Sequence, residues 1–253
     1  MSFIQDKVEL IEKKELKNGI FDYKISSPEI AGMAMAGQFL HILCPSVFLR
    51  RPISICEIDK KNGTVRFVFQ VKGNGTAALA EINEGEKTDV LGPIGNGFEI
   101  LPKTKPVLVG GGIGVPPLLE LAKELKGDCK VVLGFRSADF LILEDDFKAT
   151  GAEVFVMSDD GSCGGKGLVT EKLEELDFDY IYSCGPMPML KAVQAFAEKS
   201  QIESQLSLEE RMGCGVGACL VCACKTNSGG SENYSRVCKE GPVFKGNEVV
   251  FDA

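Results

Sequence analysis

The sequence predicts a β plus α/β protein that begins with an antiparallel β-barrel or sandwich and continues with a parallel sheet and its crossover helices. Asn-Gly pairs at 18–19 and 62–63 separate β-rich runs, which is a strong hairpin signal. From about residue 104, buried-strand runs alternate with helical patterns, as in parallel sheets. A loop-rich segment from about residue 204 holds five of the ten cysteines. The predicted parts are therefore 1–101, 102–203 and 204–253.

Composition excludes several classes of protein. The formal net charge of −8 leaves no basic stripe with which to neutralise nucleic-acid phosphates. No apolar run approaches the roughly 18 residues that span a bilayer, and the charged opening MSFIQDKVELIEKKEL is unlike a signal peptide. We therefore expect a cytoplasmic protein without nucleic-acid or membrane partners, in which clustered cysteines bind metal or carry out redox chemistry.

The chain has one histidine, His41, in the run FLHILCP. A single imidazole excludes most histidine-based acid–base, nucleophilic and zinc-hydrolase mechanisms. Chemistry near neutral pH is therefore expected to depend on a cofactor. We interpret His41 itself as a structural strand residue rather than a ligand.

An RPIS motif, residues 51–54, lies among the β-rich runs of the first part. Arg51 suits a phosphate group, because a guanidinium can donate two parallel hydrogen bonds. The alternative is a surface arginine before an edge-strand proline, and residues 51 and 54 would face opposite sides of a regular strand. The next run, TVRFVFQV, is dense in β-branched and aromatic residues and precedes a GNGT motif.

Two motifs in the second part each follow a predicted strand and open a predicted helix. In the GGGIG motif, residues 110–114, small residues let the backbone approach a pyrophosphate at a helix N-terminus. A tight turn is the alternative, because the glycine spacing departs from the usual dinucleotide fingerprint. The second motif, CGPMPM at 184–189, could on its own be a turn with a buried thiol.

The acidic loop Ser158–Gly161 bears on which nicotinamide dinucleotide would bind. A 2′-phosphate needs basic partners near the adenosine ribose, and this loop should repel it. Arg136 is the residue that would favour NADP, because its positive charge suits a 2′-phosphate. The loop favours NAD over NADP.

Three cysteines of the third part have the spacing C-x4-C-x2-C, and Cys238 follows sixteen positions after the last of them. This is the plant-type ferredoxin spacing of a [2Fe–2S] cluster, and neighbouring glycines let backbone N–H groups reach the sulfurs. Structural zinc is the alternative, but zinc sites usually show two short cysteine pairs. Cys224 lies outside the spacing and is interpreted as a spare thiol. The predicted metal ligands are Cys214, Cys219, Cys222 and Cys238.

Together, RPIS, GNGT, GGGIG, CGPMPM, RMGCGVGAC and VCKEGPVF cover essentially the whole chain. The set resembles the ferredoxin-reductase family of flavoproteins, and within it the electron-transfer subunits of NAD-linked, class 1B dihydroorotate dehydrogenases. The resemblance implies an FAD-binding β-barrel domain, a Rossmann-like NAD-binding domain and a small [2Fe–2S] domain. It also implies catalytic roles for Ser54, beside flavin N5, and for Cys184, beside the nicotinamide ring. The implied FAD residues are Arg51, Pro52, Ile53, Ser54, Val68, Phe69, Gln70, Gly75 and Thr76. The implied NAD residues are Gly111, Gly112, Ile113, Gly114, Cys184, Gly185, Pro186 and Met187.

The resemblance further implies a partner, an FMN-containing catalytic subunit that oxidises dihydroorotate, in a heterotetramer with two copies of each subunit. Electrons would pass from FMN through the cluster to FAD and then to NAD+. A flavin must stand between cluster and NAD+, because the cluster carries single electrons and NAD+ accepts hydride. Alternatives are a subunit of an NADH-dependent ferredoxin:NADP reductase or of a sulfhydrogenase, and, in a different class, an interaction protein stabilised by zinc.

Overall fold

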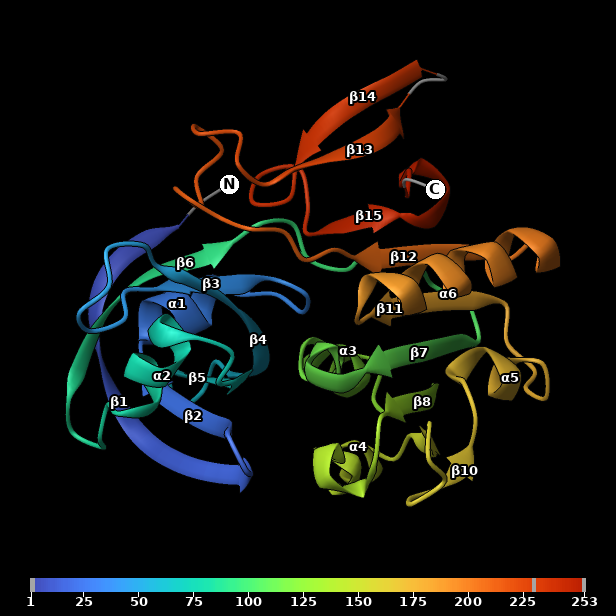
Figure 1. Cartoon of the computed structure of the whole chain (residues 1–253), viewed down its shortest axis with the longest axis horizontal. Coiled ribbons are helices and arrows are strands. Elements are labelled where there is room, and N and C mark those ends of the chain that lie inside the picture. Colours follow the sequence, from blue (N-terminus) through green and yellow to red (C-terminus); the bar gives the residue numbers. More distant parts are fainter. Residues whose placement is uncertain (1–2, 229–230, 252–253) are drawn as a thin grey trace.

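The computed structural model describes residues 3–228 and 231–251. A β-barrel formed by the first part lies beside a layered α/β unit, and a two-stranded hairpin projects from the region where the two meet (Figure 1). In the residues that it describes, no helix is long and apolar enough to cross a membrane.

The first part is a closed barrel of antiparallel strands, which excludes the sandwich alternative. Both Asn-Gly signals are confirmed as turns, because Gly19 and Gly63 have φ of 71° and 68°, a region that favours glycine. Their hairpins join β1 to β2 and β4 to β5. The strand order around the barrel is β1-β2-β5-β4-β3-β6. The strands are β1 (Ile4–Lys17), β2 (Ile20–Ser26), β3 (Phe39–Ile42), β4 (Arg51–Asp59), β5 (Thr64–Gln70) and β6 (Lys87–Ile94).

Two short helices that we did not predict interrupt the barrel sequence: α1 (Pro28–Met33) and α2 (Asn74–Ala80). A start signal for α1 was present, since Ser27 is its N-cap and its Oγ accepts the N–H of Ile30 at 3.4 Å. Helix α2 opens at the GNGT motif, where Thr76 Oγ1 accepts the N–H of Lys72 at 2.9 Å.

The second part is a mainly parallel sheet with the order β10-β9-β8-β7-β11-β12-β15. Alternate residues of its strands face opposite layers: Leu108 packs in a cluster with α3 and α4, whereas Val107 and Val109 pack with α5 and α6. Strands β12 and β15 show that the sheet continues into the last fifty residues. The strands are β7 (Pro106–Gly111), β8 (Lys130–Phe135), β9 (Glu153–Ser158), β10 (Gly165–Lys166), β11 (Tyr180–Cys184), β12 (Glu203–Ser207) and β15 (Val243–Lys245). The helices are α3 (Pro117–Glu124), α4 (Glu144–Ala149), α5 (Val169–Leu173) and α6 (Met187–Ser200), with one-turn 3-10 helices at Gly112–Gly114, Ala138–Phe140 and Gly246–Glu248.

An ion-pair network joins the barrel to the α/β part. Arg66 on β5 contacts Asp22 at 2.8 Å and Glu57 at 3.1 Å within the barrel, and Asp146 on α4 at 2.5 Å. Lys123 on α3 in turn contacts Glu57 at 3.0 Å. The side chains of Arg66 and Asp22 are only 14 % and 12 % exposed, so this ion pair is largely shielded from solvent, and the bond from Arg66 to Asp146 connects the barrel to the α/β part.

The cysteine-rich segment after β12 is mostly loop and contains the hairpin of β13 (Ala223–Ser228) and β14 (Ser231–Arg236), which Cys238 follows. Figure 1 shows this segment over the upper end of the barrel, next to β6.

Candidate functional site

The two predicted dinucleotide motifs lie side by side, because β7 and β11 are neighbouring parallel strands. Both motifs follow the carboxyl ends of these strands, where ligands of open α/β sheets bind. The backbones touch: a Cβ on Gly114 would stand 2.5 Å from Gly185 Cα, and one on Gly185 would stand 3.1 Å from Gly111 N. Glycine at 114 is therefore required for this close approach.

A cavity of about 630 Å³ opens beside these motifs and reaches the barrel. The α/β part contributes Gly111, Gly112, Ile113 and Pro186 from the predicted NAD set, and the barrel contributes Gln70 from the predicted FAD set. Arg136 and Asp159 line the same cavity, so the basic and acidic residues that bear on NADP and NAD both face it. The remaining lining residues are Ile20, Lys72, Gly134, Phe135, Phe140, Gly167, Leu168, Val169, Thr170, Pro188, Met189 and Ala192.

The other members of the predicted NAD set lie outside this lining. Gly114 and Gly185 form the backbone contact behind it, and the Met187 side chain is 54 % exposed. Cys184 is buried at the end of β11, in register with Gly110 and Ser207. Burial raises the pKa of its thiol to about 12, against a hydrogen bond with Ser207, so this thiol stays protonated at neutral pH.

On the barrel, the structure brings together two separate parts of the predicted FAD set. The Arg51 guanidinium lies against Gly75, where a Cβ would stand 2.3 Å from Arg51 Nε. Arg51 donates to the carbonyl of Leu49 at 2.7 Å, which fixes the guanidinium over the start of α2. A side chain at position 75 would clash with this guanidinium, so the contact requires glycine there. The RPIS and GNGT motifs together form one cationic surface suited to a phosphate.

The rest of the FAD set has varied surroundings. Val68 and Phe69 are buried in the core, so they can offer a flavin only their backbone. Ser54 is partly exposed and pairs with Phe39 across β3 and β4. The partly exposed residues Pro52 and Ile53 stand beside it on β4.

The four predicted cluster ligands form two pairs. Cys219 Sγ accepts the N–H of Cys214 at 3.4 Å, and Cys222 Sγ accepts the N–H of Cys238 at 3.5 Å. Two thiolates for each of two irons is the ligand set of a plant-type [2Fe–2S] cluster. The pairing of the thiols therefore fits a two-iron cluster.

Backbone N–H groups converge on the first of these sulfurs. Cys214 Sγ accepts from Val216 at 3.4 Å, Ala218 at 3.3 Å and Cys219 at 3.4 Å. Burial by itself would raise the pKa of the Cys214 thiol, but these donors lower it to about 6. These donors thus favour a thiolate at Cys214, the form that binds iron, whereas burial and the neighbouring Cys222 raise the pKa of Cys238 to about 12.

Cys224 is directed differently from the predicted ligands. It lies on β13 opposite Ser235, and its thiol donates to the Ser235 carbonyl at 3.4 Å. Burial raises the pKa of this thiol to about 11. The hydrogen bond to Ser235 agrees with its interpretation as a spare thiol.

The cluster-binding loop, residues 213–222, contacts the barrel where Gly215 packs on the ring of His41. Beyond the hairpin, the carbonyl of Gly241 accepts the N–H of Asn96 at 2.6 Å. Arg236, at the end of β14, donates to the carbonyl of Gly217 in the loop at 2.7 Å. Sequence reasoning missed these contacts because residues far apart in the chain make them.

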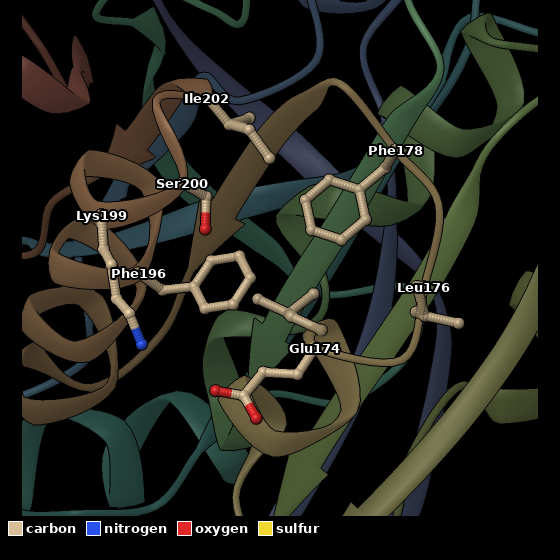
Figure 2. Close-up of a pocket in the computed structure, with 8 residues that line it drawn as sticks. Glu174, Leu176, Phe178, Phe196, Lys199, Ser200 and Ile202 are labelled. Atoms are coloured by element: carbon tan, nitrogen blue, oxygen red, sulfur yellow. The ribbon is translucent and has the colours of Figure 1, made fainter.

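A second hollow, of about 330 Å³, lies between α5 and α6. Figure 2 shows the rings of Phe178 and Phe196 facing each other across it, with Glu174 and Lys199 at its rim. Phe178 precedes β11, whereas the dinucleotide motifs follow the strands. This hollow is therefore at the opposite edge of the sheet from the predicted site.

The closed barrel with the Arg51–Gly75 surface, the parallel α/β sheet and the ferredoxin-type cysteine spacing are those of a flavin- and iron–sulfur-dependent reductase of the ferredoxin-reductase type. Residues 209–250 match the family model described as the iron-sulfur cluster binding domain of dihydroorotate dehydrogenase B. The chain belongs to the family of electron transfer subunits of NAD(+)-dependent dihydroorotate dehydrogenase B. It is 44 % identical over 257 residues to the subunit so named from Lysinibacillus sphaericus, covering 97 % of this chain and 98 % of that one. It is 46 % identical over 219 residues to that of Caldanaerobacter subterraneus, covering 85 % of this chain and 87 % of the relative.

Solved structures agree with this fold. An NADH-dependent reduced ferredoxin-NADP oxidoreductase superposes with a TM-score of 0.87 at 33 % identity, covering 97 % of this chain and 90 % of that one. A ferredoxin NADP+ reductase from Neisseria gonorrhoeae, solved with FAD and NADP, superposes with a TM-score of 0.65 at 18 % identity, covering 79 % and 92 % of the two chains. The second likeness supports the fold alone.

Proposed function

We propose that this chain carries electrons between an FMN-containing dihydroorotate dehydrogenase subunit and NAD+ in pyrimidine synthesis. The observation that carries the proposal is the pairing of four thiols on a segment that contacts the barrel at His41 of β3. The predicted dinucleotide cavity is lined by different barrel residues, Ile20 and Gln70 of β2 and β5. When bound, the cluster supplies one-electron transfer and FAD supplies the conversion to hydride transfer.

Each group of residues has a distinct part in this proposal. Arg51 and Gly75 hold the diphosphate of FAD, with Thr76 shaping the turn, and Ser54 stands at the reactive side of the flavin. Gly111–Gly114 and Gly185–Met187 hold the dinucleotide in the cavity, and the neutral Cys184 thiol borders the nicotinamide. Cys214, Cys219, Cys222 and Cys238 ligate the cluster.

Substrate oxidation is assigned to the partner subunit, in an assembly with two copies of each chain. The functional division into 1–101, 102–203 and 204–253 is retained, although β12, which begins at Glu203, and β15 carry the α/β sheet into the last range. We place the assembly in the cytoplasm. The second candidate function is that of an NADH-dependent ferredoxin:NADP reductase subunit, which the 33 % identical solved structure favours. It predicts electron exchange with ferredoxin rather than with the dihydroorotate-oxidising partner.

Two serine variants test the assignment of the cluster ligands, one at a predicted ligand and one at the cysteine that we interpret as a spare thiol. Cys219→Ser should bleach the cluster absorbance and abolish partner-dependent NAD+ reduction, while NADH-dependent diaphorase activity largely survives because FAD remains. Cys224→Ser is the matched control, one strand away in the same segment, and should keep both the cluster and the coupling. Iron and sulfide analysis, the visible spectrum and both assays are measured on the same preparations. Coupling retained in Cys219→Ser, or a cluster lost in Cys224→Ser, would show that the ligand set is wrong.

A further inference from the structure

The only histidine of the chain, His41, lies beneath the cluster-binding loop. It sits on β3 opposite Pro52 of the RPIS motif, and its side chain is wholly buried. No described residue makes a hydrogen bond of ordinary geometry to either ring nitrogen. Such a side chain calls for an explanation, since buried polar atoms nearly always have a partner.

Gly215 of the cluster-binding loop faces this ring. A Cβ on Gly215 would stand 2.5 Å from His41 Nδ1, and the φ of Gly215 is 71°. The loop can therefore pack against the imidazole only because residue 215 is glycine. The place of contact is next to Cys214, the first proposed ligand.

The buried imidazole lies against the backbone of Cys214 and Gly215. A neutral ring has one N–H donor and one acceptor nitrogen, so it can bond to a peptide group without bringing a charge beside the cluster.

The peptide between Cys214 and Gly215 immediately precedes the loop residues whose N–H groups approach the first sulfur. Three of them converge on Cys214 Sγ, from Val216, Ala218 and Cys219, at 3.3–3.4 Å. Donors aimed at cluster sulfurs stabilise the extra negative charge of the reduced state and so raise the reduction potential. A group that fixes this peptide therefore acts on the potential through the loop.

We propose that His41 is a positioning residue whose Nδ1 hydrogen-bonds the Cys214–Gly215 peptide and thereby sets the reduction potential of the cluster. The proposal rests on the proposed function in one respect, the assignment of Cys214 as a cluster ligand. It extends that function because it makes a barrel residue, on the strand beside the RPIS motif, responsible for the match between cluster and flavin potentials.

The test is an EPR-monitored redox titration of the isolated holoprotein and three variants. His41→Leu removes both nitrogens and keeps an apolar side chain of similar bulk. His41→Asn places an amide close to the position of Nδ1. Thr88→Val, a control on the neighbouring strand β6, removes a buried hydroxyl that bonds the Leu43 carbonyl at 2.9 Å.

We expect His41→Leu to lower the cluster midpoint by about 59 mV, a tenfold change in the one-electron equilibrium constant. His41→Asn should recover most of this shift, and Thr88→Val should show none. A wild-type midpoint and line shape in His41→Leu would overturn the proposal and leave the ring a packing role. If His41→Leu loses its cluster, His41→Asn decides: a retained cluster at the wild-type potential supports the proposal, and a lost one refutes it. Cluster signal and diaphorase activity in the wild-type protein report separately on the proposed function.

Discussion

Gly114→Ala is the substitution that the geometry of the dinucleotide motifs constrains most closely. The added methyl would lie 2.5 Å from Gly185 Cα, 2.6 Å from Gly185 N and 2.7 Å from the Cys184 carbonyl oxygen. Ordinary carbon–carbon contacts are about 3.5–4.0 Å, so the two motifs must separate by about 1 Å. All three neighbours are backbone atoms, which a rotamer change cannot move.

Misplacement of reacting groups by about 1 Å can cost about a hundredfold in rate. We therefore expect kcat/KM for NADH in the diaphorase assay to fall about a hundredfold, which corresponds to about 2.7 kcal/mol of transition-state stabilisation. Overpacking should also cost about 1–3 kcal/mol of folding stability, measured by urea denaturation. FAD content should stay complete, because the barrel is untouched.

Gly32→Ala in α1 is the control for this prediction, because a Cβ there meets no atom within 4 Å. Its kinetics should match those of the wild-type protein. Wild-type kcat/KM in a fully flavinated Gly114→Ala protein would refute the reasoning that both motifs form one dinucleotide site.

Three further predictions concern other parts of the structure. Arg51→Gln should weaken FAD binding about 30-fold by isothermal titration, since a hydrogen bond to a charged group contributes about 2 kcal/mol; unchanged affinity would remove the Arg51–Gly75 surface from the flavin site. Arg66→Met leaves the mostly buried carboxylate of Asp22 without its cation, while Glu57 keeps Lys123, and should lower the free energy of unfolding by about 3 kcal/mol. In the same network, burial by itself would raise the pKa of Glu57, but hydrogen bonds from Lys123 and Arg66 lower it. The free energy of unfolding should therefore fall as the pH drops below about 4.5, and it should fall less in Glu57→Gln. Asp159→Asn should raise kcat/KM for NADPH about tenfold by removing a repulsive charge from the cavity, and no change would place the ribose elsewhere.

Local pattern was sufficient for much of the fold. Asn-Gly turns, β-rich runs and the strand–glycine–helix pattern depend on neighbouring residues, so the barrel and the parallel sheet were predicted. The strand Val243–Lys245 was not, because three residues carry no readable period and pair only through a tertiary contact with β12. Helix α1 was missed although Ser27 and Pro28 gave a usable start signal.

The candidate site was predictable in its motifs but not in their contacts. The spacing of Cys214, Cys219 and Cys222 predicts the ligand set, and the structure adds the pairing of Cys214 with Cys219 and of Cys222 with Cys238. The approach of Arg51 to Gly75 joins residues that no local period relates. His41 shows most clearly what the sequence does not predict. An imidazole in an apolar strand is expected to be structural, and its contact with Gly215 is visible only in the structure.

The most direct test of the central claim is a mixing experiment under anaerobic conditions. Purified chain is combined with the FMN-containing catalytic subunit, dihydroorotate and NAD+, and NADH formation is followed at 340 nm. Neither subunit alone should reduce NAD+ with dihydroorotate, whereas the mixture should do so, and the Cys219→Ser chain should fail in its place. No stimulation by the partner, or equal stimulation of Cys219→Ser, would contradict the account.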